Sequence, residues 1–571
     1  MNFTGAELII HLLERQGVRI VAGIPGGALL PLYEALGRSD RITHILARHE
    51  QAAGFIAQGM ARITGKAGVC FATSGPGVTN MVTALADAKL DSVPLVCISG
   101  QVPQHLIGTD AFQEVPTIDI VSPIAKATFF VRDAAELLHV VPEAFRLAET
   151  GRPGPVLIDV PKDVQAQTVR TPTEGLFNLV SPSPDFHPIA QDQRGSFDLA
   201  WQMITQAVRP VLYVGGGVTK TRSHGLLREL AEISHIPVTT TLMALGALPT
   251  HHPLSLGMLG MHAARYTNQV IEECDLLIAI GARFDDRATG RPDRFAPNAR
   301  VIHIDIDARE FGKIRQPTLA IECDAATALH ELLARATHHS RGEWLQRIRA
   351  LKADAPLQTP GRDRVCSPYG IVHAVGELAP HDAIITTDVG QHQMWVAQAY
   401  PFRRPDRWLT SGGLGTMGFG LPAAMGAALA APEAVVICFT GDGSILMNIQ
   451  ELATLAELDL NVKIIVLDNG ALGLVRQQQT LFYRRRLVAS QFAQPSNFVA
   501  IARGFGIQAL DLGATSEAGS VLADALRTEG PMLIRVPIDA DEHVLPMVAP
   551  GAANIDALDH VSDSLAQQTY S

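Results

Sequence analysis

The sequence lacks the paired cysteines and long apolar runs that mark secreted, zinc-binding and membrane proteins. Its 571 residues contain six cysteines, none in a CxxC spacing, and several lie inside apolar, strand-like runs. This pattern is typical of reduced cysteines in the core of a cytoplasmic protein. No stretch approaches the roughly eighteen uninterrupted apolar residues of a membrane-spanning helix. We therefore expect a cytoplasmic protein without a transmembrane segment.

Positive charge is also scarce. The formal net charge is −11, and the only basic run is Arg484-Arg485-Arg486, which we interpret as a solvated loop. Binding to nucleic acid needs clustered Lys and Arg to contact phosphates, so the charge balance argues against that role.

The first residues favour a folded helix over a targeting segment. Apolar side chains recur on one helical face with acidic ones beside them: Leu8, Ile9, Leu12 and Leu13 with Glu7 and Glu14. A signal peptide needs an uninterrupted apolar stretch, and a transit peptide is poor in acidic residues. We expect an amphipathic helix that is not cleaved off.

What the sequence does contain is a regular alternation of short β-branched runs, which end in Gly or Asp, with helical patterns. This alternation is typical of parallel sheets with crossover helices, so the expected fold class is α/β. The length suggests about three or four domains, and we take three, each a doubly wound parallel sheet. We place them at 1–167, 190–340 and 365–550, with a Ser/Pro/Asp/Gln-rich linker at about 168–195 and a tail at 551–571 as a candidate lid.

The most informative stretch is VVICFTGDGSILMNIQELATLAELDLNVKIIVLDNGALG, which contains a strand, a Gly-rich turn, a helix and a second strand. Asp442 follows the first strand and Asn469 the second. Parallel strands of a right-handed βαβ unit end at the same sheet edge, so both oxygens can converge on a hard cation shared with a phosphate. Gly441 and Gly443 let the backbone approach that phosphate, and Ser444 opens a helix whose amides favour an anion.

Asp-Gly and Asn-Gly are also ordinary turn dipeptides, so either pair alone would indicate only a turn. Both pairs at matching strand ends favour the metal interpretation. A GDG motif followed by Asn after about 27 residues resembles the signature of thiamine-diphosphate enzymes. The resemblance implies thiamine diphosphate and Mg²⁺ as cofactors, with the backbone carbonyl of Ala471 as a third protein ligand to the metal.

The segment RITHILARHEQAAGFIAQGMARITG predicts a strand at 42–47 and a helix from Glu50 to about Gly65. In the thiamine-diphosphate family an RHE-like sequence carries the Glu that exchanges a proton with the cofactor's aminopyrimidine nitrogen. The resemblance assigns that catalytic role to Glu50; the alternative is a first-turn Glu favoured by the helix dipole. In the family this Glu reaches a cofactor held mainly by another subunit, which implies a homodimer or homotetramer.

Further segments along nearly the whole chain resemble acetolactate synthase (acetohydroxyacid synthase) catalytic subunits. They include GIPGGALLPLYEAL, ATSGPGVTN, GRPGPVLIDVPKDVQ, GARFDDRATGR, GTMGFGLPAAMGA and LVRQQQTLFY. The resemblance implies a transferase that decarboxylates pyruvate and condenses the hydroxyethyl carbanion with pyruvate or 2-oxobutanoate. This is the first common step of branched-chain amino acid biosynthesis. A small regulatory subunit is a further implied partner.

The same resemblance assigns roles to single residues. Gly27 lies near the reacting carbon, and Phe112, Gln113 and Lys126 line the substrate channel. Lys126 attracts the carboxylate of a 2-oxo acid, with an exposed lysine as the alternative. Met417 supports the bent cofactor, a role that ordinary core packing of a methionine would resemble. Diphosphate contacts are assigned to Gln391, His392 and Gln393.

The middle block is implied to bind FAD without a net redox role. VLYVGGGVT alone is weak evidence, because its dinucleotide fingerprint is incomplete. GARFDDR is stronger, since Arg283, Asp285 and Arg287 offer charge and hydrogen bonds to the cofactor. Where the family usually has Gly after Met-His, this chain has Ala263. The other implied flavin contacts are Arg152, Gly215, Gly216, Thr241, Leu242, Gly260, Met261, His262, Gly281, Asp305, Ile306, Asp324 and Ala325.

One departure from the family concerns the second substrate. The family often has Trp in the segment GMVxQWQ, where it favours 2-oxobutanoate, but this chain has Gln478, like one branch of bacterial isozymes. We therefore predict weak discrimination between 2-oxobutanoate and pyruvate. The rival functions are a simple 2-oxo acid decarboxylase, a pyruvate oxidase and a catalytically silent flavoprotein. Gln113, Lys126 and Gln478 favour carboligation over these.

Overall fold

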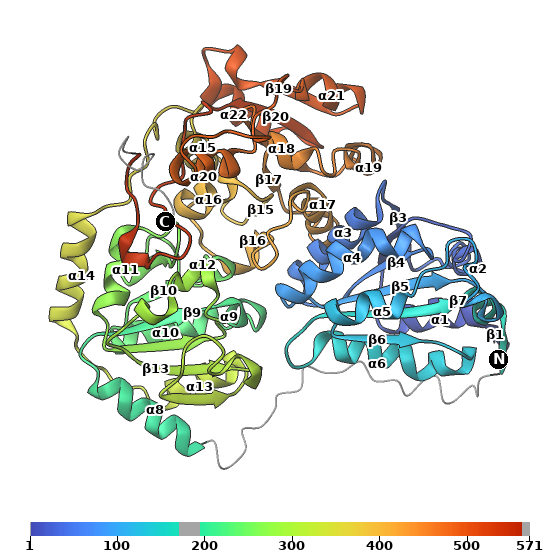
Figure 1. The fold of residues 1–571 in the computed structure, drawn as a ribbon, viewed down its shortest axis with the longest axis horizontal. Helices are drawn as coiled ribbons and strands as arrows, with labels where there is room; N and C mark the ends of the chain where they lie inside the picture. The colour runs from blue at the N-terminus through green and yellow to red at the C-terminus, as the bar shows by residue number, and fades with distance from the viewer. Residues whose placement is uncertain (1, 171–193, 562–571) are drawn as a thin grey trace.

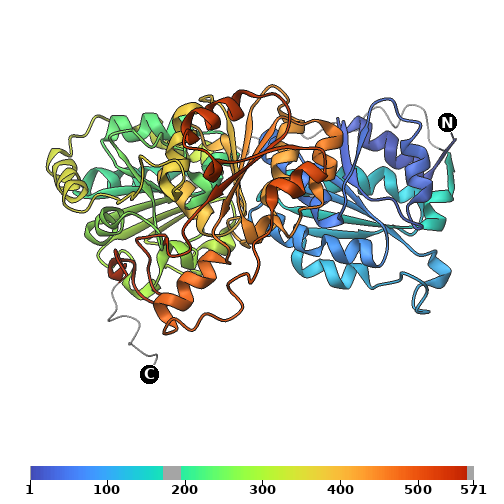
Figure 2. The ribbon, with the colours of Figure 1, turned by 90° about the horizontal axis from the view of Figure 1, so that it is seen from above.

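The computed structural model describes residues 2–170 and 194–561, so most of the predicted linker and the end of the predicted tail lie outside the described residues. The described chain forms three units, each built around a six-stranded sheet (Figure 1). In Figure 2 the C-terminal unit (gold to red) stands between the N-terminal unit (blue to cyan) and the middle unit (green). The predicted α/β fold class is confirmed. The exact domain limits stay predictions.

The N-terminal sheet is entirely parallel, because each connection crosses back through a helix. α1 (Gly5–Arg15) packs on one face; α3 (Glu50–Thr64) and α4 (Pro76–Leu90) pack on the other. The predicted first helix is confirmed: a Thr4–Glu7 capping box starts α1. The strand order is β3 (Thr43–Leu46), β2 (Ile20–Gly23), β4 (Gly68–Ala72), β5 (Leu95–Gln101), β7 (Pro155–Pro161), β6 (Ala127–Phe130).

The middle sheet is parallel as well. Its order is β11 (Ser255–Met258), β10 (Val238–Thr240), β9 (Pro210–Val214), β12 (Leu276–Ile280), β13 (Arg300–Asp305), β14 (Leu319–Glu322). The helix α14 (Gly342–Asp354) buries Trp344, Ile348 and Leu351 in the core of this unit and packs against α11 (Arg265–Glu273). The chain therefore stays with the middle unit through α14.

The C-terminal sheet repeats the same design with only parallel pairs. Its order is β16 (Trp408–Leu409), β15 (Ile384–Thr387), β17 (Val436–Gly441), β18 (Val462–Asp468), β20 (Met532–Pro537), β19 (Gln508–Asp511). The two strands predicted before Asp442 and before Asn469 are present as β17 and β18. All six cysteines are free, and Cys70, Cys97 and Cys438 lie in buried strands, as expected. Among the described residues no helix combines the length and apolar character needed to cross a membrane.

The N-terminal and C-terminal units meet where α3 crosses α17 (Gly420–Ala430). Two glycines make the crossing close: a Cβ on Gly59 would lie 2.2 Å from the backbone oxygen of Ala423, and one on Gly426 would lie 2.0 Å from that of Ile56. Any larger residue would collide with backbone there. This close crossing fixes the helix that begins with Glu50 against the C-terminal unit.

Candidate active site

The predicted metal ligands meet at the carboxyl ends of the neighbouring strands β17 and β18. The backbone N–H of Ala471 donates to Oδ2 of Asp442 at 3.1 Å and to Oδ1 of Asn469 at 3.2 Å, so both side-chain oxygens converge on one amide. Asp442 is 3% exposed, and burial, together with the carboxylate of Asp468, raises its pKa. A cation here would offset that cost of burying charge. The oxygen donors match the ligand chemistry of Mg²⁺.

An unpaired nitrogen lies at the next strand end. His392 is in the first turn of α16 (Gln391–Ala399), after β15, and its buried Nε2 has no hydrogen-bond partner in the described structure. Burial lowers the pKa of His392 to about 3, so the ring is neutral. A Cβ on Gly441 would lie 2.9 Å from this ring. A buried polar atom without a partner is costly, which suits a place that a diphosphate completes.

The neighbouring glutamines are engaged within the protein. The amide nitrogen of Gln391 donates to the side-chain oxygen of Gln477 at 2.9 Å, and its oxygen accepts from Asn469 at 3.1 Å. Gln393 instead donates to the hydroxyl of Thr410 at 2.7 Å. Gln391 therefore holds the side chain of Asn469 in place. Gln393 instead binds the segment that follows β16, at Thr410.

That segment presents Met417, and a residue not singled out from the sequence holds it. Asp388 follows β15, is fully buried, and accepts from the amides of Gly418 at 2.7 Å and Gly420 at 3.3 Å. Burial raises its pKa to about 6, and these amides oppose the shift. An Asp directly after the strand IITT is the signal that would have identified it.

Glu50 is the first residue of α3 and is 9% exposed. Nδ2 of Asn80, on α4, donates to its Oε2 at 2.9 Å. Asn80 was also not singled out, although it ends the segment ATSGPGVTN. Among the described residues Asn80 is the only hydrogen-bond partner of the Glu50 carboxylate, so Oε1 is available to a ligand.

Gly27 and Gln113 lie at the same carboxyl edge as Glu50, in the segments after β2 and β5. A Cβ on Gly27 would meet nothing within 4 Å, so open space borders its backbone. Gln113 has a φ of 61° and packs against Gly75, where a Cβ would lie 2.8 Å from its carbonyl oxygen. Phe112 is 88% exposed, an unusual position for so large an apolar side chain.

Lys126 does not join this group. It directly precedes β6, at the amino edge of the sheet, and its Nζ donates to the carbonyl of Thr150 at 2.6 Å. Burial and the neighbouring Lys89 and Arg146 lower its pKa to about 8. At the carboxyl edge the first residue after β7 is Lys162, a lysine that the sequence analysis passed over.

The predicted flavin residues line one edge of the middle sheet. All its strands are parallel, and each of the six is followed within a few residues by one of the predicted contacts. By strand order these are Gly260, Met261 and His262; Thr241 and Leu242; Gly215 and Gly216; Gly281 and Arg283; Asp305 and Ile306; Asp324 and Ala325. Such an edge is where open α/β sheets bind ligands.

Local geometry at this edge suits a bound group. A Cβ on Gly215 would lie 2.0 Å from the carbonyl of Gly281, and the buried hydroxyls of Thr240 and Thr241 have no hydrogen-bond partner in the described structure. Burial raises the pKa of Asp305 to about 6. Orphaned hydroxyls beside small residues indicate that something polar completes the site.

Other predicted flavin contacts have partners within the protein. Asp285 caps α12 (Asp286–Thr289) and Asp324 caps α13 (Ala325–Arg335), each accepting from backbone amides. Arg152, from the N-terminal unit, pairs with Asp307 at 3.1 Å and Glu310 at 2.6 Å. Arg152 thus connects the N-terminal unit to the middle unit just after β13.

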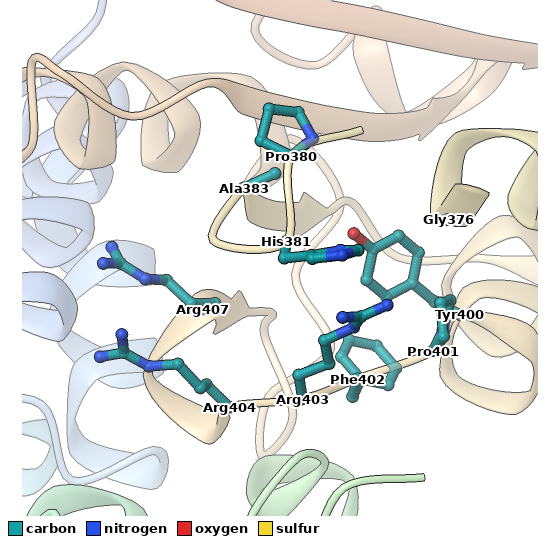
Figure 3. A pocket seen from close by; sticks show the side chains of 10 residues that line it. All are labelled: Gly376, Pro380, His381, Ala383, Tyr400, Pro401, Phe402, Arg403, Arg404 and Arg407. Atoms are coloured by element: carbon teal, nitrogen blue, oxygen red, sulfur yellow. The ribbon is translucent and has the colours of Figure 1, made fainter. Parts of the chain in front are cut away.

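A separate hollow on the C-terminal unit contains none of the predicted site residues (Figure 3). Arg404 there pairs with Asp406 at 2.6 Å. Ala383 directly precedes β15, so the hollow lies near the amino edge of the sheet, opposite to Asp442. It is lined by Gly376, Pro380, His381, Ala383, Tyr400, Pro401, Phe402, Arg403, Arg404 and Arg407.

Comparison with protein families gives the class that this fold and site define. Three models match the three units: thiamine pyrophosphate enzyme, N-terminal TPP binding domain (residues 3–122), central domain (197–332) and C-terminal TPP binding domain (388–536). The chain is thus a thiamine pyrophosphate enzyme.

Similar curated proteins narrow the class. Acetolactate synthase isozyme 1 large subunit of Escherichia coli (strain K12) is 55% identical over 97% of this chain and 97% of its own length. Isozyme 2 large subunit of that organism is 44% identical over 98% and 100%, and acetolactate synthase 1, chloroplastic, of Zea mays is 44% identical over 97% and 88%. Within its class the chain belongs to the acetolactate synthase family, and its activity is that of a transferase.

Proposed function

We propose that the chain joins two 2-oxo acids, with thiamine diphosphate and Mg²⁺ held at the carboxyl edge of the C-terminal sheet. The observation that carries the proposal is the convergence of Asp442 and Asn469 on the amide of Ala471. Asp442, Asn469 and the carbonyl of Ala471 would hold the metal, and the unpaired Nε2 of His392 would be available to the diphosphate. When bound, thiamine diphosphate supplies the electron sink for decarboxylation and carbon–carbon bond formation.

The protein's own contribution is to move one proton and to exclude water. Glu50 gives a proton to the pyrimidine nitrogen and takes it back. The hydrogen bond from Asn80 fixes the orientation of the Glu50 carboxylate. The low exposure of Glu50 keeps this exchange away from solvent. Gly27 supplies backbone without a side chain beside the reacting carbon, and Met417 supports the cofactor from the segment that Asp388 holds.

We assign FAD to the carboxyl edge of the middle sheet, where it has no net redox role. The alignment of the predicted contacts with six strand ends supports this, as do the unpaired hydroxyls of Thr240 and Thr241. Met261 and Arg287 follow strands at the same edge, and Nη1 of Arg287 lies 4.0 Å from Sδ of Met261. Flavin absorbance that stays with the purified chain is the direct check, and loss of FAD lowers the unfolding temperature because only the folded chain binds it.

We propose a cytoplasmic homodimer or homotetramer of catalytic subunits. Within one described chain the Glu50 carboxylate makes no hydrogen bond to the C-terminal unit, and Phe112 is 88% exposed, so a second copy would both complete the site and cover this side chain. Free cysteines support the compartment. The relatives are called large subunits, which supports a small regulatory partner.

Gln113 and Gln478 remain our choices for the channel that receives the second 2-oxo acid. The structure brings Gln113 to the edge that carries Glu50, and Gln478 is half-buried on α20 (Gly473–Phe482). For the substrate carboxylate we keep Lys126 as the sequence-based candidate and add Lys162, because it stands at the carboxyl edge. Comparing Lys126→Met with Lys162→Met separates the two, since loss of the carboxylate partner raises KM for pyruvate.

The test of the proposed function measures products and the role of Glu50 together. With pyruvate, thiamine diphosphate and Mg²⁺ the protein forms acetolactate; acetaldehyde or peroxide in its place would support the decarboxylase or oxidase alternatives. Glu50→Gln still binds the cofactor, but turnover falls by about a hundredfold or more, because general acid–base catalysis contributes roughly 10²–10⁴. Unchanged turnover in that variant would refute the assignment of the proton donor.

A further inference from the structure

The segment that carries Glu50 is held by the other unit of the chain. Residues 46–49 join β3 to α3, and the backbone N–H of Arg48 donates to Oε1 of Glu451 at 2.9 Å. Glu451 opens α19 (Glu451–Leu458), in the C-terminal unit. The N–H two residues before Glu50 therefore depends on a side chain from a distant part of the sequence.

Both carboxylate oxygens of Glu451 accept hydrogen bonds. It is 0% exposed, and the hydroxyl of Thr454 donates to its Oε2 at 2.9 Å. The same hydroxyl lies 3.3 Å from the carbonyl of Leu46, so the pair grips the segment at Leu46 and at Arg48. A carboxylate that accepts a backbone amide forms one of the stronger hydrogen bonds in proteins.

The cost of burying this charge indicates that the contact is specific. Burial raises the pKa of Glu451 to about 7, while the hydrogen bonds from Thr454 and from the Arg48 amide lower it. If the side chain were removed, a partly buried backbone donor next to α3 would lose its partner. The segment would then shift to find water or another acceptor.

The contact between Arg48 and Glu457 offers a matched comparison. The guanidinium of Arg48 pairs with Glu457 at 2.7 Å, one helical turn beyond Thr454, but both side chains are partly exposed. Exposed ion pairs contribute little. Two carboxylates of α19 thus contact Arg48. The buried one, Glu451, accepts from its backbone N–H, and the exposed one, Glu457, pairs with its side chain.

We propose that Glu451 is a positioning residue for Glu50: it fixes the backbone from which α3 starts and so aims the carboxylate at the cofactor. The inference rests on the proposed role of Glu50. Glu451 follows Asp442 closely in the same chain, so the polypeptide that supplies the metal ligand also aims this carboxylate. In a dimer where Glu50 reaches the cofactor bound by the partner, Glu451 would link the metal site of its own chain to the cofactor site of the partner.

The first test needs no cofactor. Backbone hydrogen exchange is measured on a peptide covering residues 46–51 of the full-length apo protein. Glu451→Ala loses about tenfold or more of the protection of the Arg48 amide, because the amide loses its hydrogen-bond acceptor. Glu451→Gln retains an acceptor oxygen, so the Arg48 amide keeps most of its protection. In Glu457→Gln the protection equals that of the wild type. Equal protection in Glu451→Ala and wild type would overturn the proposal.

The second test follows exchange of the C2 hydrogen of bound thiamine diphosphate for deuterium by quenched-flow NMR. Glu451→Ala slows this exchange about tenfold to a hundredfold, as a displacement near 1 Å does in catalysis, with unchanged affinity for the cofactor. Glu451→Gln restores it to within about threefold. If exchange stayed slow in Glu451→Gln as well, or if cofactor affinity fell by the same factor as the exchange rate, Glu451 would have a structural role only.

Two further variants keep the result interpretable. Glu451→Asp retains the charge but withdraws it by one methylene, so it serves if Glu451→Ala does not fold, and exchange at the wild-type rate in it would overturn the inference. Glu50→Gln is measured in parallel. If Glu50→Gln exchanges normally, the proposed function of Glu50 fails; if only the Glu451 variants exchange normally, the positioning role alone fails.

Discussion

At the scale of single residues, what separates the roles is the local partner and not the residue type. Glu50 and Glu451 each begin a helix and are each buried, but Glu50 has one hydrogen bond, to Asn80, whereas both oxygens of Glu451 are used by neighbours in the chain. A carboxylate with an open oxygen can exchange a proton with a ligand. One with both oxygens engaged holds structure. For Gln478 the predicted substrate preference stays a prediction.

A buried histidine predicts how stability depends on pH. His262 is 5% exposed, its Nδ1 lies 3.1 Å from the carbonyl of Pro546, and burial lowers its pKa to about 4. Between pH 6.5 and 4 the unfolded chain binds a proton there that the folded chain does not. Stability is therefore present above pH 6.5 and lost as the pH falls towards 4.

His262→Gln keeps a donor for Pro546 but removes the titration. Relative to that variant, the wild type loses on the order of 3 kcal/mol of unfolding free energy between pH 6.5 and 4, since each pKa unit is worth about 1.4 kcal/mol. Urea unfolding of both proteins across this range is the measurement. Parallel curves would show that His262 titrates normally in the fold.

At the scale of elements, the crossing of α3 and α17 depends on two glycines. Gly59→Ala forces a methyl to within 2.2 Å of the backbone oxygen of Ala423. We expect a loss of roughly 3 kcal/mol or more in unfolding free energy, because backbone on both sides has to move apart. Thermal unfolding measures it.

The matched control is Gly225→Ala in α10 (His224–Ser234), where a Cβ meets nothing within 4 Å. That variant gains about 0.5–1 kcal/mol, the usual advantage of Ala over Gly in a helix. If both substitutions behaved alike, the helices would not be in close contact in solution.

A second element-scale device joins the same two units. Asp87 on α4 and Asp91, the C-cap of that helix, accept hydrogen bonds from the segment that leads to Met417. Asp91 accepts from the amides of Gly412 at 3.1 Å and Gly413 at 2.7 Å. Arg62 of α3 pairs with Asp91 at 2.8 Å and offsets part of the buried negative charge. The N-terminal unit thus holds the Met417 segment while Glu451 holds the Glu50 segment.

At the scale of the whole molecule, the proposed dimer makes a prediction about mixed subunits. Glu50→Gln and Asp442→Ala are each inactive alone. Coexpressed, they form mixed dimers in which one site receives an intact Glu50 from one chain and an intact Asp442 from the other. A purified mixed dimer has about half of the wild-type activity, because one of its two sites is complete.

The measurement uses differently tagged chains, so that mixed dimers are purified before acetolactate is assayed. Coexpression of the two tagged forms of Glu50→Gln alone serves as the control. Complete inactivity of the mixed dimer would place both groups in one chain's own site.

The sequence alone was enough to predict the α/β class, the three parallel-sheet units along the chain, and the meeting of Asp442 with Asn469. Strand ends and parallel pairing follow from local patterns, and two ligands at neighbouring strand ends converge because parallel strands share an edge. The family likeness then supplied the cofactor and Glu50. The role of Lys126 stays a prediction. The sequence does not show at which edge of the sheet a lysine lies until the strand next to it is known, and the structure places Lys126 directly before β6.

The tertiary structure decided what depends on contacts between distant segments. Asn80, Asp388 and Glu451 act on residues up to about four hundred positions away, and no local period or motif records such pairs. Whether a carboxylate is free to react or holds a loop is likewise set by its neighbours in space. The sequence by itself thus determined the cofactor class and predicted the sheet edge that would anchor it, whereas packing between the units decides which distant side chains contact the Glu50 segment, because only the folded chain brings them together.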